Sequence, residues 1–120
     1  MIPVRLPFRL FLDERNDSTI SPSIRDNQIW EPLETALINK LVSAGDTVLD
    51  IGAHIGYFTV LFAQLVGEHG FVYGFEPEKH NYSLLQANVL TNRLGNVIIE
   101  NQAVSNSSGV AGLYLSSYNK

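Results

Sequence analysis

The chain has 120 residues, of which 45% are hydrophobic and 17% charged, a composition typical of one globular domain. Its formal net charge of −4 disfavours a surface that tracks phosphates, so we expect no nucleic-acid partner. With no cysteine, the sequence excludes a disulfide framework, a thiolate nucleophile and a sulfur-ligated zinc site. No apolar run approaches the roughly 20 residues that a bilayer-spanning helix needs, so we expect a soluble, cytoplasmic protein with no membrane span.

Residues 1–30 are predicted to form an edge strand followed by a polar loop. Apolar residues occupy every second position from Val4 to Leu12, which is the period of a strand, and Pro7 confines such a strand to a sheet edge. The stretch DERNDSTISPS that follows is rich in turn-forming residues.

Residues 31–120 are predicted to alternate between helices and strands. The leucines at positions 33, 37 and 41 predict a helix with one apolar face, and a strand over 48–50 follows. Further helices are expected in YFTVLFAQLVG and KHNYSLLQANVLTNRLG, further strands in FVYGFEPE and NVIIENQAV, and a short fourth strand in VAGLYLSS. This alternation is typical of a parallel sheet with flanking helices, so the fold class is α/β.

The turn after the first of these strands carries the clearest functional signal. In VLDIGAHIGYFT, residues 48–59, a buried strand stops at Asp50 and the chain turns through Gly52 to Gly56 before a helix begins. Ligands of open α/β sheets bind beyond the carboxyl ends of the strands, and glycines let a ligand approach the backbone closely. Glu76 ends the second strand 24 residues beyond Gly52, at a spacing suited to an acid that pairs with ribose hydroxyls. The pattern predicts an adenosine site.

Two ligands fit such a site. A dinucleotide normally requires G-x-G-x-x-G, whereas this chain has D-x-G-x-x-x-G, and Asp50 would face an anionic pyrophosphate unfavourably. The same aspartate suits a ligand that carries an ammonium and a sulfonium group, which favours S-adenosylmethionine. His54, His69 and His80 share no ligand spacing, so no metal site is expected.

The segments WEPLETALINKL, GDTVLDIGAHIGYFTVLFA, GFVYGFEPEKHNYSLLQANV and VIIENQAVS resemble, in this order, the amino-terminal half of FkbM-type S-adenosylmethionine-dependent methyltransferases. The resemblance implies a Rossmann-like class I methyltransferase fold with an incomplete parallel sheet. It also implies a set of cofactor-binding residues: Asp50, Gly52, Ala53, His54 and Gly56 in the loop, Glu76 on the ribose, Pro77 beside it, and Gln102 and Ala103 at the adenine.

The expected reaction is methyl transfer to an oxygen, and the resemblance implies a sugar or secondary-metabolite hydroxyl, hence a small-molecule or saccharide acceptor. The residues identify no catalytic base. The K-I-D-x-E-G-like strand of the family is not found before Lys120, so we interpret the chain as a fragment that carries the cofactor half-site and is inactive alone. The alternatives are an NAD-dependent oxidoreductase of Rossmann type and a non-catalytic truncated remnant.

Overall fold

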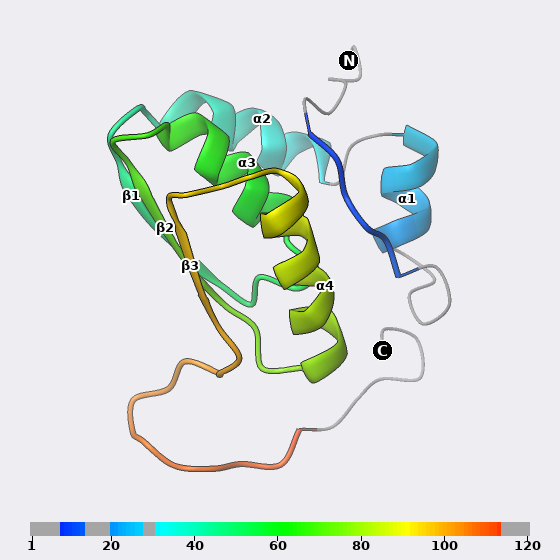
Figure 1. Ribbon diagram of the computed structural model, residues 1–120, viewed down its shortest axis with the longest axis vertical. Coiled ribbons are helices and arrows are strands. Elements are labelled where there is room, and N and C mark those ends of the chain that lie inside the picture. The colour runs from blue at the N-terminus through cyan, green and yellow to red at the C-terminus, as the bar shows by residue number, and fades with distance from the viewer. Residues whose placement is uncertain (1–7, 14–19, 28–30, 114–120) are drawn as a thin grey trace.

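The computed structural model describes residues 8–13, 20–27 and 31–113. Three parallel strands lie in the order β1 (Thr47–Ile51), β2 (Phe71–Phe75) and β3 (Val97–Glu100). The described helices are α1 (Ile20–Asn27), α2 (Pro32–Leu41), α3 (Tyr57–Val66) and α4 (Lys79–Thr91). Figure 1 shows α3 and α4 on one side of the sheet, with α2 beside α3. This partial Rossmann-like fold confirms the predicted class.

Helix α3 forms the centre of the core, because both of its sides are covered. Towards the sheet, Ala63 and Val66 pack with Val72 of β2. On the other side, Tyr57 and Leu61 pack with Ile24 of α1, and Phe8, Leu10 and Leu12 join this cluster. The nearly all-apolar sequence of this helix predicts such double burial, and the prediction is confirmed.

Within the described residues, helices cover one face of the sheet and leave the other exposed. Val72 on the helix side is fully buried, whereas Leu49, Ile51 and Ile98 on the opposite face are 63%, 60% and 44% exposed. The leucines of α2 are also exposed, by 78%, 54% and 68% at Leu33, Leu37 and Leu41. The helix that their spacing predicts is confirmed, but Thr35 and Ile38 are the residues of α2 that face α3.

The amino-terminal prediction needs two corrections. Residues 8–13 form no strand, because their backbone is hydrogen-bonded to the side chains of Asn88 in α4 and Asn92 just after it; the part of this prediction before residue 8 lies outside the described residues. The predicted polar loop contains helix α1, whose Ile24 is only 4% exposed and reaches the core. The predicted fourth strand is not formed at 110–113, where the chain is exposed and irregular, and the rest of that prediction lies outside the described residues.

Candidate cofactor site

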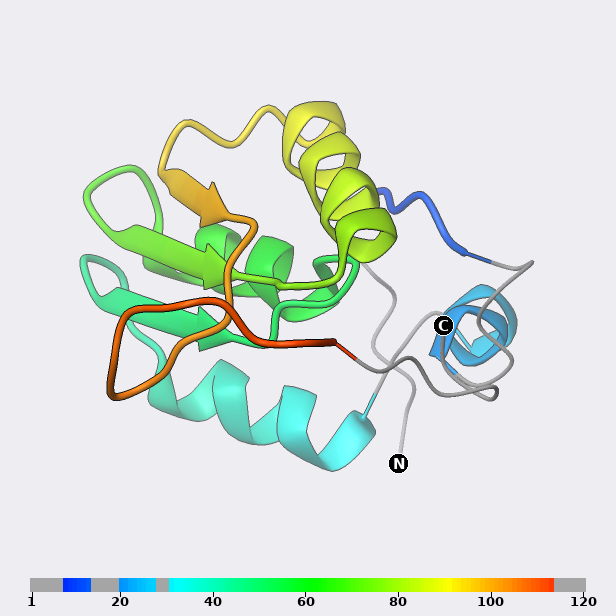
Figure 2. The same ribbon diagram turned by 90° about the horizontal axis from the view of Figure 1, so that it is seen from below.

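The carboxyl ends of the strands meet at one edge of the sheet. In the parallel register, Ile51 lies beside Phe75 and Phe75 lies beside Glu100, so the three strands end side by side. The loop 52–56, Glu76 and Asn101 therefore start from neighbouring points (Figure 2). This is the edge at which open α/β sheets bind ligands.

The loop 52–56 is held in a conformation that few residues adopt. Gly52, His54 and Gly56 have φ angles of 77°, 55° and 103°. Gly52 and Ala53 both donate backbone hydrogen bonds of 2.9 Å to the carbonyl of Phe75, which joins the loop to β2. Positive φ is strained for a histidine but not for glycine, so the surrounding contacts have to hold His54 in place.

Glu76 supplies one of these contacts. It is only 6% exposed, and its Oε1 accepts a hydrogen bond of 2.7 Å from the backbone N–H of His54. Its Oε2 accepts one of 3.0 Å from the N–H of Glu78. The carboxylate thus links the acidic end of β2 to the glycine loop, and each oxygen keeps a second lone pair for a ligand hydroxyl.

Asp50 lies at the end of β1 on the helix-covered face of the sheet. Its Oδ2 accepts a hydrogen bond of 2.6 Å from the hydroxyl of Thr59. Burial raises the pKa of Asp50 above its ordinary value, the Thr59 hydroxyl opposes that rise, and the negative charge of Glu76 adds to it. Two carboxyl groups therefore influence each other at this edge of the sheet.

The remaining predicted residues lie at the same edge but differ in exposure. Ala53 is buried, Pro77 is half-buried, and Gln102 and Ala103 are exposed in the irregular segment that follows β3. The Nδ1 of His54 is buried and has no hydrogen-bond partner among the described residues. Asn101, which the sequence reasoning missed, donates from Nδ2 to the carbonyls of Glu76 and Pro77 at 2.8 and 3.0 Å.

Thr59 and Asn88 are further residues that the sequence reasoning missed. Thr59 lies in the first turn of the helix that follows the loop, and Asn88 donates to the carbonyl of Ile55 within the loop. Both are polar residues with no exposed surface. A polar position on the apolar side of a predicted helix was the signal that could have identified them.

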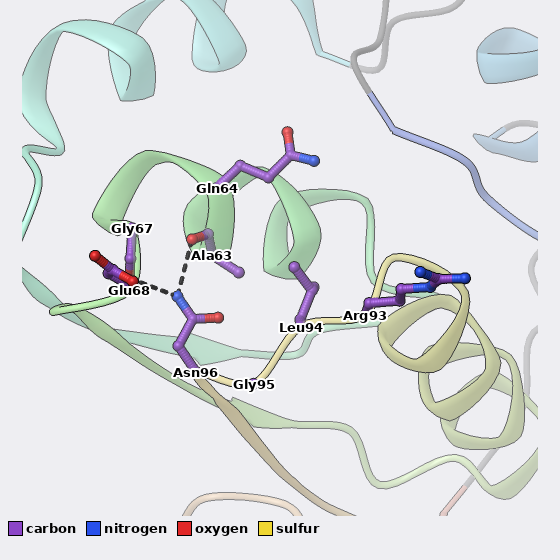
Figure 3. Close-up of a pocket in the computed structure, with 8 residues that line it drawn as sticks. All are labelled: Ala63, Gln64, Gly67, Glu68, Arg93, Leu94, Gly95 and Asn96. Carbon is purple, nitrogen blue, oxygen red and sulfur yellow. Dashed lines mark hydrogen bonds between the residues drawn. The ribbon is translucent and has the colours of Figure 1, made fainter.

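A pocket of about 480 Å³ lies at the other end of α3 (Figure 3), away from the glycine loop. There Asn96 donates from Nδ2 to the carbonyls of Ala63 and Gly67, at 3.0 and 2.8 Å, and so caps the end of the helix. The lining residues are Ala63, Gln64, Gly67, Glu68, Arg93, Leu94, Gly95 and Asn96. None of them belongs to the predicted site.

Two other kinds of site are absent from the described part of the chain. Among the residues that the structure describes, no three His, Asp or Glu side chains are grouped to hold a metal ion. No helix in the described part of the chain is long and apolar enough to cross a bilayer.

Several solved methyltransferase structures share this fold. A protein described as a putative rRNA-methylase from Clostridium thermocellum is 27% identical over 60% of this chain and 39% of its own, with a TM-score of 0.58. A SAM-dependent methyltransferase from Aquifex aeolicus is 27% identical over 68% of this chain and 42% of its own, with a TM-score of 0.55. Trm5b from Pyrococcus abyssi shares the fold at 21% identity, covering 80% of this chain and 26% of its own, with a TM-score of 0.60.

This chain therefore spans less than half of the length of these structures. The neighbours support the prediction of S-adenosylmethionine as the cofactor. They contradict the expectation that no nucleic acid is involved, because proteins described as rRNA methylases carry this fold. A net charge of −4 does not exclude a nucleic-acid partner, since nucleic-acid binding depends on the local distribution of charge and not on its total.

Among curated proteins, no sequence matches this chain. A family model does match: the TRM5/TYW2 methyltransferase domain, over residues 30–111. The comparisons support the predicted methyltransferase but not specifically the FkbM type. Because the match covers more than half of the 120 residues, the chain belongs to the TRM5/TYW2 methyltransferase domain family.

Proposed function

We propose that this chain forms the cofactor-binding half of an S-adenosylmethionine-dependent methyltransferase. The observation that carries the proposal is the hydrogen bond of 2.7 Å between Glu76 Oε1 and the N–H of His54. It places the acid that follows β2 directly against the glycine loop that follows β1. The family and the SAM-dependent neighbour from Aquifex aeolicus support the same cofactor.

The residues fit this cofactor in charge and in space. Asp50 and Glu76 bring two carboxyl groups to the strand ends, which suits a cationic ligand with ribose hydroxyls and disfavours a pyrophosphate. A side-chain atom added at Gly52 would meet nothing within 4 Å, so there is open space above the loop. We assign ribose binding to Glu76, and the loop contacts to Asp50, Gly52, Ala53, His54 and Gly56. Pro77, Gln102 and Ala103 are assigned to the surrounding wall.

When bound, S-adenosylmethionine supplies a methyl group already activated by its positively charged sulfur. The contribution of this chain is then orientation: a loop fixed by Glu76 holds the adenosyl part in one place, and holding reactants in line lowers the barrier of a displacement. Asp50 and Glu76, the acids beside the loop, are assigned here to cofactor binding, so we assign neither of them as a general base.

We further propose RNA as the methyl acceptor of the whole protein. The Clostridium thermocellum protein described as a putative rRNA-methylase supports this acceptor, and the comparisons give no support to the sugar or secondary-metabolite hydroxyl expected from the sequence. Incubation of the protein with methyl-labelled S-adenosylmethionine and total RNA should leave label in ribonuclease-sensitive material. Label that appears only with a saccharide mixture would contradict this acceptor.

The cofactor proposal is tested by titration of the chain with S-adenosylhomocysteine, with NAD as a second ligand. Glu76→Gln should lower the affinity for S-adenosylhomocysteine about 10- to 100-fold, because a hydrogen bond to a charged group contributes about 1.5–3 kcal/mol. Glu100→Gln is the matched control, since it makes the same change at the exposed end of the neighbouring strand. Glu100→Gln should keep its affinity for S-adenosylhomocysteine within about twofold of the wild-type value, as expected for a change on the surface.

Three other results of these titrations would change the assignment. An unchanged affinity in Glu76→Gln would remove Glu76 from the site. Binding of NAD as tight as that of S-adenosylhomocysteine would favour an oxidoreductase. No binding of either ligand by the folded wild-type chain would contradict the proposal and favour a non-catalytic remnant.

A further inference from the structure

The segment 8–13, here called the strap, lies along helix α4, and two asparagine side chains hold its backbone. Asn92 accepts from the N–H of Arg9 at 3.0 Å and donates to the carbonyl of the same residue at 2.7 Å. Asn88 likewise accepts from the N–H of Phe11 and donates to its carbonyl at 3.1 Å. Each amide therefore pairs with one residue of the strap as a neighbouring strand would. Figure 1 shows the strap in dark blue beside α4.

The spacing of the two asparagines matches an extended chain. Four residues of α-helix rise about 6 Å, and two residues of extended chain span about 6.6 Å. Side chains at Asn88 and Asn92 can therefore meet the backbone of residues 11 and 9 in turn. The alternate strap residues Phe8, Leu10 and Leu12 turn towards the core cluster around α3.

Asn88 has one more partner, and it lies in the cofactor loop. Its Nδ2 also donates to the carbonyl of Ile55 at 2.6 Å, and the side chain has no exposed surface. Glu76 accepts from His54, the preceding residue of the loop. Two consecutive loop residues are thus held from two different elements, α4 and the end of β2. The side chain of Asn92, which caps α4, has no contact with the loop among its hydrogen bonds, which go to the backbone of Arg9 and to the main-chain carbonyl of Asn88.

We infer that Asn88 is a positioning residue that couples the strap to the cofactor loop. When Phe11 is paired with it, the amide of Asn88 is fixed and presents its N–H to Ile55. The strap then contributes to the shape of the cofactor site without contacting the ligand. The inferred effect on ligand affinity rests on the proposed function, whereas the effect on the loop itself does not.

The test removes single backbone donors from the strap. Phe11→Pro deletes the N–H that Asn88 accepts, and Arg9→Pro deletes the one that Asn92 accepts. Both residues have exposed side chains, which makes them a matched pair. Phe11→Ala keeps the N–H and controls for loss of the ring. Amide hydrogen exchange at His54 and Gly56, measured without ligand, reports on the loop.

Phe11→Pro should speed exchange at His54 and Gly56 about three- to tenfold, as expected for loss of one hydrogen bond. Arg9→Pro and Phe11→Ala should leave these two amides within about twofold of wild type. The affinity for S-adenosylhomocysteine should follow the same order, falling only in Phe11→Pro. A general loss of stability would instead speed exchange across the whole sheet, including Val72 in β2.

Equal amide exchange rates at His54 and Gly56 in Phe11→Pro and Arg9→Pro would overturn the inference. Exchange that is faster across the whole sheet in Phe11→Pro would overturn it as well. If the wild-type chain does not bind S-adenosylhomocysteine, the proposed function fails, but the exchange measurement still decides whether the strap is coupled to the loop.

Discussion

The hydroxyl of Thr59 donates a hydrogen bond of 2.6 Å to the carboxylate of Asp50, nine residues earlier in the chain. Thr59 has no exposed surface, and a side-chain carbon added at Gly74 of β2 would lie 3.7 Å from its methyl group, an ordinary packing distance. The contact joins the end of a strand to the first turn of the next helix across the cofactor loop. It therefore fixes the orientation of one of the two acids of the site.

Replacing Thr59 tests the value of this contact. Thr59→Val keeps the shape but leaves the partly buried carboxylate of Asp50 without its donor, so we expect a loss of about 1–3 kcal/mol in the free energy of unfolding. Thr59→Ser keeps the hydroxyl and should lose less than half as much. Urea denaturation measures both. If the two variants are equally destabilised, the hydroxyl contributes no more than the methyl group, which would contradict the expected weight of the hydrogen bond.

Asp50→Asn should make the protein more stable at neutral pH and weaken its ligand binding. Because burial raises the pKa of Asp50 above its ordinary value of 3.8, the native state binds the proton more tightly than the unfolded chain. The ionised carboxylate thus costs stability at pH 7, and this cost disappears as the pH falls through the native pKa towards the ordinary value.

At pH 7 the melting temperature of Asp50→Asn should therefore exceed that of the wild type, by about 4–8 °C for each kcal/mol gained in the free energy of unfolding. This difference should vanish by about pH 3. The affinity for S-adenosylhomocysteine should fall, because the attraction between the carboxylate and the ammonium group is lost. Thermal melts from about pH 3 to 8 and a titration at pH 7 check both parts. A gain that is the same at every pH would argue against an electrostatic cause.

The two loop glycines should differ in their tolerance of alanine. Both have positive φ, which costs alanine about 1–2 kcal/mol. At Gly56 the added carbon would also lie 2.8 Å from Cδ1 of Leu85, whereas at Gly52 it would meet nothing within 4 Å. We expect Gly56→Ala to lose about 2–5 kcal/mol and Gly52→Ala about 1–2 kcal/mol. Equal losses, measured by urea denaturation, would mean that Leu85 moves aside without cost.

Threonine substitutions should have different effects on stability on the two faces of the sheet. Leu49→Thr and Ile51→Thr change residues that are 63% and 60% exposed, so the free energy of unfolding should change by less than about 1 kcal/mol. Self-association, measured by sedimentation, should decrease because exposed apolar area is removed. Val72→Thr is the control on the buried face and should cost about 1–3 kcal/mol. Unchanged self-association in Leu49→Thr and Ile51→Thr would show that the exposed face of the sheet takes no part in contacts between molecules.

The sequence predicts the central part of the fold well. The apolar run of α3, the glycine at its start and the acid after β2 are local signals, and each appears where the pattern places it. The strand ends then bring the loop and Glu76 together because parallel strands share one edge. The predictions at Gln102 and Ala103 lack this support, since both residues follow the last described strand.

The errors concern contacts that no local pattern reveals. The alternation at positions 8, 10 and 12 does indicate extended chain with one apolar face, but the sequence does not show that its hydrogen-bond partners lie on a helix about 80 residues later. In α2, helical periodicity identifies an apolar face at Leu33, Leu37 and Leu41, but not which side of the helix meets α3. Tertiary packing decides both cases.

The pairing of the strap with α4 also determines which mutations it can tolerate. Because Asn88 and Asn92 bond to main-chain atoms, the side chains at positions 9 and 11 take no part in these hydrogen bonds. We therefore expect most residue types other than proline to be accepted at both positions. An insertion or deletion of one residue between them would instead shift the register and place the apolar side chains of the strap on the wrong side. At positions 9 and 11 the strap therefore has to preserve its length and register, whereas Phe8, Leu10 and Leu12 also have to stay apolar.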